Sequence, residues 1–259
     1  MLGKSSPTWI DFTIGSIVIV VFVVTIFMNV LALNYTYTKI RKPSIKKIPH
    51  LFVGALSMSG LGIALFQFPP FIISRFSGVW DYNSAVCSLV AFAIVLFGTL
   101  TISLVVVMSL ERLAAIVFPF YYNEHATIRR SVFAVLLLVV YSTVVATLSV
   151  VLSHVELNVS TGVCLYTVDT FNSNTRALVY ILVSHYLLSL ITMFVANITV
   201  FHAVHKLDSK SVSDEYSKNQ CEGKKSSMKS GACVNFAKMV GILALCYTVC
   251  WTAVLVRLL

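Results

Sequence analysis

Six long runs of apolar residues, separated by polar stretches, follow one another along the chain. They cover about residues 12–34, 50–73, 86–110, 131–153, 177–201 and 236–256. Each run holds about 20 residues or more, enough for an α-helix to cross a hydrocarbon layer of about 30 Å. The two-residue alternation of membrane β-strands is absent. The pattern predicts an all-α membrane protein in which residues 1–259 form one transmembrane helical domain.

Composition supports the same class of protein. Hydrophobic residues make up 58% of the chain, charged residues make up only 11%, and the mean hydropathy is +0.89. Soluble domains carry about 25% charged residues. The first run is too long for a secretory signal peptide, and no small-residue cleavage site follows it. The net charge of +9 does not indicate nucleic-acid binding, because no basic surface stripe interleaves with aromatic residues.

The distribution of basic residues predicts the orientation. Fifteen of the 19 Lys and Arg residues lie in segments 35–49, 111–130 and 204–238. The positive-inside rule therefore places these segments in the cytoplasm and the N-terminus outside, as in a multi-pass plasma-membrane protein. Asn158, in the sequence Asn-Val-Ser, is a glycosylation acceptor in a predicted outer loop. The acceptor sequences at Asn34 and Asn197 fall at or inside predicted spans, so we expect them to stay unmodified.

The only long polar stretch, residues 205–232, is enriched in Ser, Lys and Gly. This composition predicts a flexible cytoplasmic linker. No metal-ligand spacing and no set of nucleophile and base accompanies the histidines near the helix ends. The sequence therefore predicts neither an enzyme nor a bound metal or cofactor.

An ionisable pair, Glu111-Arg112, stands at the inner end of the third apolar run in MSLERLAAIVFPFYY. A charge at that depth costs a few kcal/mol unless it is paired or reaches the interface, and an interfacial Arg is the simplest explanation. Two cysteines, a proline and a phenylalanine lie at positions along the sequence that bear on the role of this pair. Cys87 begins the same run, and Cys164 lies in the next outer loop, on the oxidising side. Pro119 and Phe120 follow, and the proline predicts a helix end and a cytoplasmic turn.

This combination resembles class A (rhodopsin-like) G-protein-coupled receptors. The resemblance implies a bundle with six of its seven helices present and a Cys87–Cys164 disulfide. It implies a switch at Glu111 and Arg112, and a contact with a heterotrimeric G protein through Pro119 and Phe120. In Cys-Trp-Thr-Ala on the sixth run, Trp251 would be the activation lever. The partners implied are the G protein, membrane lipids and a small extracellular ligand, without nucleic acid.

Some positions depart from the family's pattern. Gly60 stands where the second helix usually carries an Asp that binds sodium, so sodium modulation is not expected. Ala253 replaces the proline that kinks the sixth helix. Cys233 stands where many receptors have an acid that pairs with the Arg of the third helix. We therefore expect Arg112 to pair only with Glu111.

Within class A, the stretches LFG…SLERLAAIVFPFYYNEHATIRR and MVGILALCYTVCW are similar to prostanoid receptors. This similarity makes a lipid one candidate ligand. Ile94 stands where receptors for amines place an Asp, which argues against an ammonium ligand. His185 and Tyr186 on the fifth run are candidate polar contacts in the ligand pocket, although a His in a span is more often packed and hydrogen-bonded.

The chain stops at Leu259, where the sixth run ends, and a seventh helix would follow in the family. We consider three interpretations: a truncated sequence, a splice form or degraded gene, and a genuine six-helix protein. We favour the first two. Loss of that helix predicts impaired signalling. Two functional alternatives remain open, a non-signalling partner of full receptors and a six-helix transporter or channel. A transporter usually repeats its broken helices in two halves, and only Pro69-Pro70 forms such a break.

Overall fold

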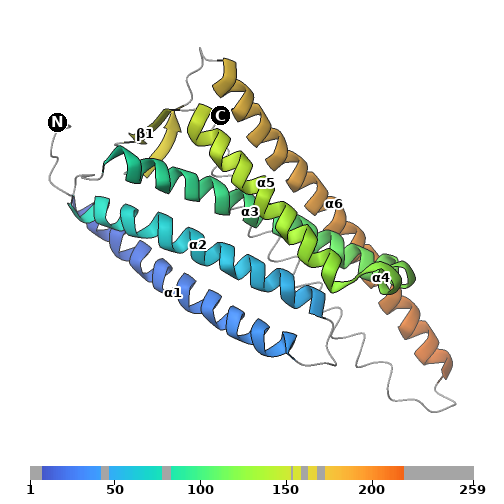
Figure 1. Cartoon of the computed structure of the whole chain (residues 1–259). Coiled ribbons are helices and arrows are strands. Elements are labelled where there is room, and N and C mark those ends of the chain that lie inside the picture. Colours follow the sequence, from blue (N-terminus) through green and yellow to red (C-terminus); the bar gives the residue numbers. More distant parts are fainter. Residues whose placement is uncertain are drawn as a thin grey trace. The chain divides into compact units, whose positions relative to one another are not determined.

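The structure is a computed structural model, and it describes residues 8–41, 47–77, 83–152, 154–158, 163–167 and 173–218. The elements are shown in Figure 1: α1 (Trp9–Ile40), α2 (Lys47–Ser77), α3 (Ser84–Val117), α4 (Pro119–His125), α5 (Ile128–Leu152), β1 (His154–Asn158), β2 (Val163–Thr167) and α6 (Ser173–Lys218). Five helices are long and apolar enough to cross a membrane. They contain the first five predicted spans, apart from the last residue of the fourth, and the sixth span lies outside the described residues.

The chain divides into two compact units. The first comprises Met1–Leu104 and Thr127–Leu182, and the second comprises Val105–Ala126 and Val183–Leu259. The first unit therefore holds α1, α2, the N-terminal two thirds of α3, α5, the hairpin and the start of α6. The second unit holds the C-terminal end of α3, the short helix α4 and most of α6.

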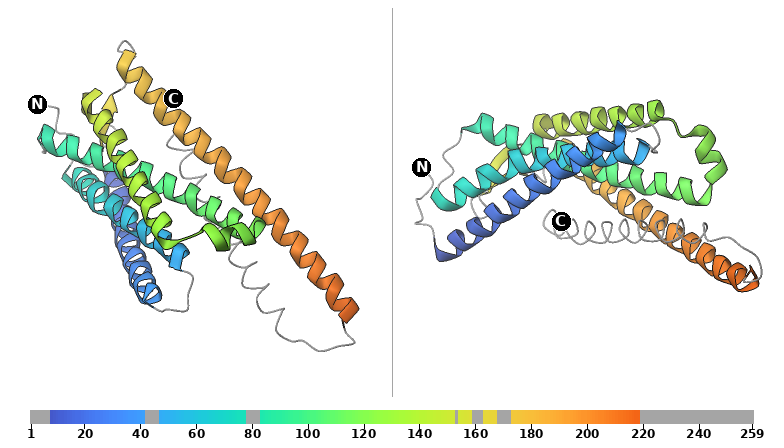
Figure 2. Two further views of the ribbon diagram at one scale, coloured as in Figure 1. Left: turned by 45° about the vertical axis from the view of Figure 1, so that its right-hand side comes forward. Right: turned by 90° about the horizontal axis from the view of Figure 1, so that it is seen from below.

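Helices α1 and α2 lie side by side and run in opposite directions (Figures 1 and 2). At one end, Asp11 of α1 accepts a hydrogen bond from Arg75 of α2, with Oδ1 and Nη1 2.9 Å apart. At the other end, the Tyr35 and His50 rings meet edge to face, with their centroids 6.0 Å apart. Both ends of this helix pair are therefore joined by side-chain contacts.

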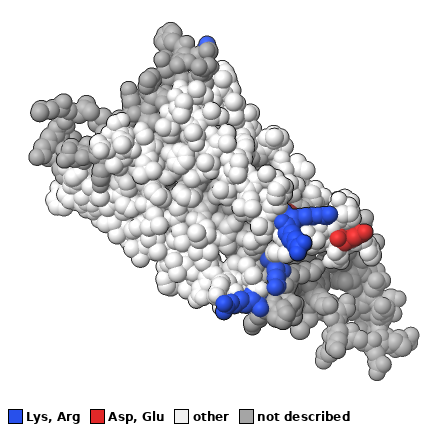
Figure 3. Space-filling view, in the orientation of Figure 1, with Lys and Arg blue, Asp and Glu red and all other residues white. Residues whose placement is uncertain are grey.

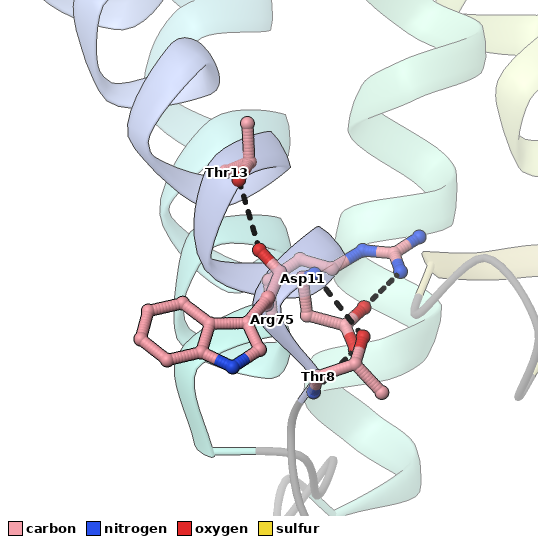
Figure 4. A network of polar contacts seen from close by, with 5 residues as sticks. Thr8, Asp11, Thr13 and Arg75 are labelled. Atoms are coloured by element: carbon pink, nitrogen blue, oxygen red, sulfur yellow. Dashed lines mark hydrogen bonds and ion pairs between the residues drawn. The ribbon is translucent and has the colours of Figure 1, made fainter.

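The first turn of α1 has a capping box, which explains why the helix begins at Trp9. The Thr8 hydroxyl accepts from the Asp11 backbone N–H at 3.4 Å, and the Asp11 carboxylate accepts from the Thr8 backbone N–H at 3.0 Å. Figure 4 shows Arg75 reaching the same carboxylate from α2. Backbone donors at a helix start have no partner within the helix, and this arrangement satisfies them. Asp11 thus serves both the helix cap and the contact between helices.

Small residues allow α2 to lie close to α3. Ser59 is buried, and its hydroxyl lies 2.7 Å from the Thr101 hydroxyl and 3.0 Å from the Phe97 carbonyl oxygen of α3. Three residues further on, a Cβ at Gly62 would lie 2.4 Å from the Phe97 ring. Pro69 and Pro70, which the sequence marks as a break, lie within α2, which stays helical to Ser77. Transmembrane helices tolerate proline where neighbouring groups satisfy the freed backbone.

The all-α class is confirmed, and the structure adds one element that was not predicted. Strands β1 and β2 pair antiparallel between α5 and α6, with His154 opposite Thr167 and Leu157 opposite Cys164. Such a hairpin satisfies backbone groups that a loop near the membrane would otherwise leave without partners. Its ten paired residues are too few to show in a hydropathy pattern based on longer runs.

Helix α6 ends at Lys218, so it extends well into the stretch predicted to be a flexible linker. Residues 205–218 contain neither Gly nor Pro, and the first glycine beyond them is Gly223. A helix that has already started can continue through such a polar segment, because each added residue gains a backbone hydrogen bond without a new nucleation cost. The remainder of the predicted linker, residues 219–232, lies outside the described residues.

Candidate functional site

The C-terminal end of α3 carries the ion pair that the sequence singles out. Arg112 Nε lies 3.3 Å from Glu111 Oε2. The side chains are 19% and 9% exposed, respectively. Removal of one partner from a pair this far from water leaves an uncompensated charge, which is costly. Both residues belong to the second unit, and so does α4, which follows them.

Tyr122 is a third member of this cluster, and sequence reasoning did not identify it. The Tyr122 hydroxyl donates a hydrogen bond to Glu111 Oε1 from α4, eleven residues downstream. The Tyr122 side chain is buried. Burial raises the pKa of the Tyr122 phenol above its usual range, and the hydrogen bond to Glu111 raises it further. Tyr122 therefore keeps its proton at neutral pH and remains a donor to the carboxylate.

The backbone at Phe118 explains how Tyr122 reaches Glu111. Phe118 leaves the helical region, with φ −124° and ψ 58°, and α4 then starts with Pro119 in its first turn. In the first turn of a helix, backbone N–H groups have no partner within the helix, so the lack of an N–H in proline costs nothing there. The fixed φ of proline also suits a helix start. Helix α3 therefore ends at Val117, before Pro119, where the sequence predicts a helix end. The turn places a short helix, not an irregular loop, beside the ion pair.

Helix α4 exposes several aromatic rings. Phe120 is 91% exposed, and Phe118 and Tyr121 are also exposed. The Tyr121 ring stacks on the His125 ring, with centroids 4.1 Å apart. Tyr122 is the one aromatic residue of this helix that is buried. The helix thus presents one ring inward, to Glu111, and its other rings outward.

The predicted ligand-pocket residues lie in different units. Ile94 is half-buried in the outer part of α3, within the first unit. His185 and Tyr186 lie on α6 within the second unit, and Tyr186 is 4% exposed. The His185 carbonyl oxygen accepts from the Ser189 hydroxyl at 2.7 Å. A shared pocket for these residues therefore stays a prediction.

At the other end of α3, Cys87 is buried in the first turn and is disulfide-bonded. Cys164 lies in β2, and its side chain falls outside the described residues. Cys164 as the partner of Cys87 stays a prediction. Asn158 is the last residue of β1, and Trp251 lies outside the described part of the chain.

Gly60 of α2, where the sequence resemblance leads one to expect an Asp, lies against Asn29 of α1. A Cβ at Gly60 would lie 2.8 Å from Asn29 Oδ1 and 3.1 Å from Asn29 Nδ2. The Asn29 amide occupies the space of a longer side chain, and its Nδ2 donates to the Thr25 carbonyl at 2.8 Å. Among the described residues, no group of three or more His, Cys, Asp or Glu side chains could hold a metal ion.

The sequence also matches a known family. Residues 28–259 match the model of the 7 transmembrane receptor (rhodopsin family). The chain belongs to this family. It is therefore a member of a receptor family, not of an enzyme, transporter or channel family.

Similarity to individual proteins agrees with membership of the rhodopsin family. The tyramine receptor tyra-2 of Caenorhabditis elegans is 30% identical over 108 residues, which span 42% of this chain and 22% of that protein. The crystal structure of squid rhodopsin superposes with a TM-score of 0.80 at 17% identity, covering 96% of this chain and 71% of that one. The second similarity supports the fold alone. Neither similarity shows the prostanoid resemblance, which stays a prediction.

Proposed function

We propose that this chain is a plasma-membrane receptor that transmits the binding of an extracellular ligand to a heterotrimeric G protein. The arrangement around Glu111 carries the proposal. Its carboxylate contacts Arg112 on one side and Tyr122 of α4 on the other, directly before a helix with exposed aromatic rings. Such an arrangement can hold a basic side chain in place until a change of conformation releases it.

The proposed switch has two states. In one state Arg112 is paired with Glu111, as in this structure. In the other, an inward or outward shift of neighbouring helices separates the pair and makes Arg112 available to the G protein. A ligand favours the second state only to the extent that it binds that state more tightly. Tyr122 stabilises the first state because its hydroxyl donates to the Glu111 carboxylate.

Pro119 and Phe120 supply the second G-protein contact. Pro119 starts α4, and Phe120, the next residue, has 91% of its surface exposed. An exposed aromatic ring at a helix start is suited to insert into an apolar pocket of a partner, and such rings often dominate binding energy. Trp251 would link this inner half to the ligand side as the activation lever.

On the outer side, a Cys87–Cys164 disulfide would tie the hairpin to the top of α3. Cys87 is disulfide-bonded, and Cys164 lies opposite Leu157 in the hairpin. An outside location, with the N-terminus extracellular, suits this bond because the extracellular side is oxidising. Glycosylation of Asn158 on the same hairpin would agree with this orientation.

Two ligand classes are candidates. Ile94 offers no charge to an ammonium group, and together with the prostanoid-like segments it favours a lipid. The match to a tyramine receptor favours an amine instead, although it covers 22% of that protein. We propose that the ligand is a lipid and that Ile94, His185 and Tyr186 line its pocket. We give the apolar side chain at position 94 more weight, because it is a residue of this chain, whereas the match to the tyramine receptor covers a small part of that protein.

The test is nucleotide exchange on purified G proteins in membranes that contain the chain, without ligand and with prostaglandin E2 or tyramine. We expect Glu111→Gln to raise ligand-independent exchange several-fold, because Arg112 loses its partner. Phe120→Ala should lower exchange in the same background, whereas Tyr121→Ala should change it little. Exchange equal to that of empty membranes for every variant would instead support a non-signalling partner of full receptors.

A further inference from the structure

Two consecutive prolines free backbone acceptors in the C-terminal half of α2. In an α-helix the N–H of each residue donates to the carbonyl four positions earlier. Pro69 and Pro70 have no N–H, so the carbonyls of Leu65 and Phe66 lack this bond. Phe68 can still offer Leu65 a bond over three positions, whereas for Phe66 the residue at that spacing is Pro69. Phe66 therefore has a carbonyl that no N–H of its own helix can satisfy at either spacing.

Gln67, the next residue, is a polar side chain at the same depth. It is half-buried, is the single polar side chain between Ser59 and Ser74, and lies about 15 Å from the end of α2 at Ser77. Among the described residues, Figure 3 shows no charged side chain over the middle of α2. An amide in such apolar surroundings costs free energy unless it is hydrogen-bonded.

The Phe66 side of α2 faces α3, which offers no donor there. The Phe66 and Phe97 rings stack with their centroids 6.0 Å apart. The Ser59 hydroxyl, seven positions earlier, lies 2.7 Å from the Thr101 hydroxyl. These contacts show that the two helices run in opposite directions, so the residues before Phe97 lie beside the part of α2 that follows Phe66. Residues 89–98 of α3 contain no polar side chain, so none can donate to the Phe66 carbonyl.

The Gln67 side of α2 lies nearer α1, which is also apolar at this level. Gly60 lies against α1, and Gln67 follows it by two helical turns on the same side. The rings of Phe22 in α1 and Phe68 in α2 meet edge to face, with their centroids 6.0 Å apart. Residues 17–24, which include Phe22, are all apolar. Neither neighbouring helix therefore supplies a side-chain partner for this part of α2.

We propose that the Phe66 carbonyl and the Gln67 carboxamide together bind a hydroxyl group of the lipid ligand. A hydroxyl group both donates and accepts, so its O–H would donate to the Phe66 oxygen while its oxygen accepts from Gln67 Nε2. The apolar surroundings, which include Ile94 of α3, suit the remainder of a neutral lipid. The inference rests on the proposed function in that the ligand is a lipid, and it names the group of that lipid that α2 recognises.

The test measures binding directly, without signalling. The full chain in phosphatidylcholine nanodiscs is irradiated with oleyl alcohol that carries a diazirine, and mass spectrometry gives the labelled fraction and the labelled peptide. We expect saturable labelling in α2 or α3, with oleyl alcohol competing about threefold or more better than oleyl methyl ether, which has no O–H to donate. Equal competition, or no saturable labelling, would overturn the proposal. Absence of nucleotide exchange alone would contradict only the proposed signalling.

Matched proline variants assign the effect to one carbonyl. Pro70→Ala supplies an N–H to the Phe66 carbonyl, whereas Pro69→Ala supplies one to the Leu65 carbonyl. Both replace proline by a better helix former, so both should fold. We expect Pro70→Ala and Gln67→Leu to raise the half-saturating concentration for labelling about threefold or more, and Pro69→Ala to leave it unchanged. Equal effects of the two proline variants would contradict a site at Phe66.

Discussion

At the scale of single residues, the inner cluster depends on three side chains with different roles. Glu111 is the acceptor, Arg112 is its charged partner, and Tyr122 is a neutral donor. A hydrogen bond to a charged acceptor contributes more than one between neutral groups, about 1.5–3 kcal/mol. Tyr122 is thus a direct contributor to the closed state of the proposed switch, although it lies on a different helix.

Replacement of Tyr122 by Phe should destabilise the protein and favour the state in which Arg112 is free. The buried Glu111 carboxylate loses its donor, so we expect a loss of about 1–2 kcal/mol and a decrease in Tm of about 2–6 °C. Thermal unfolding in detergent, followed by a thiol-reactive dye, measures the change.

The neighbouring Tyr121 provides the control for this variant. Tyr121 is exposed, and its ring would keep the stacking on His125 after replacement by Phe. We expect Tyr121→Phe to leave Tm within about 1 °C of the native value. Similar decreases for Tyr121→Phe and Tyr122→Phe would show that the bond to Glu111 is not what stabilises this region.

At the scale of helices, close approach along α2 depends on its glycines. Gly60 faces Asn29 of α1, and Gly62 faces the Phe97 ring of α3. Small residues at helix contacts allow the backbones to approach, which is the main source of association energy where lipid surrounds the helices. The glycines of α2 are therefore packing positions on two sides of one helix.

Replacement of Gly62 by Ala should test the contact with α3. The added Cβ would lie 2.4 Å from Phe97 Cε1, so the ring must move, and overpacking of this kind costs about 1–3 kcal/mol. Gly54→Ala is the matched control, because its Cβ would lie 3.1 Å from the Thr36 methyl. We expect a clear decrease in Tm for Gly62→Ala and a smaller one for Gly54→Ala. Recovery in Gly62→Ala/Phe97→Leu would identify the ring as the cause.

The outer end of α1 allows the cap and the ion pair to be measured separately. Asp11→Ala removes both, whereas Arg75→Ala removes only the pair. A helix cap contributes about 0.5–2 kcal/mol, and a partly exposed ion pair contributes about 1 kcal/mol or less. We therefore expect faster amide hydrogen exchange in the first turn of α1 for Asp11→Ala than for Arg75→Ala. The reverse order would show that the contact between helices, not the cap, orders this turn.

At the scale of the whole molecule, orientation decides which groups can serve the proposed function. The positive-inside rule and the acceptor sequence at Asn158 both predict that the hairpin lies outside. The predicted orientation would direct Glu111, Arg112 and Tyr122 to the cytoplasm, where a G protein would be found. The opposite orientation would place the same cluster outside the cell and rule out the proposed function.

Expression in cultured animal cells, followed by treatment with a glycosidase, tests the orientation. We expect the native chain to lose mass on treatment and Asn158→Gln to migrate at the treated position. Asn34→Gln and Asn197→Gln should behave like the native chain, since both residues lie on membrane helices, where the Asn197 amide donates to the Met193 carbonyl at 2.8 Å. A glycan that persists in Asn158→Gln and is lost in Asn34→Gln would reverse the predicted orientation.

The sequence by itself determined the number and approximate limits of the described membrane helices and the end of α3 before Pro119. These features are local, because the length of an apolar run and the geometry of proline depend on few neighbours. Only the tertiary structure showed that Tyr122 donates to Glu111, that Asn29 fills the space beside Gly60, and that the outer loop forms a hairpin. Such contacts depend on how separate segments pack against one another, and spacing along the chain does not specify that packing.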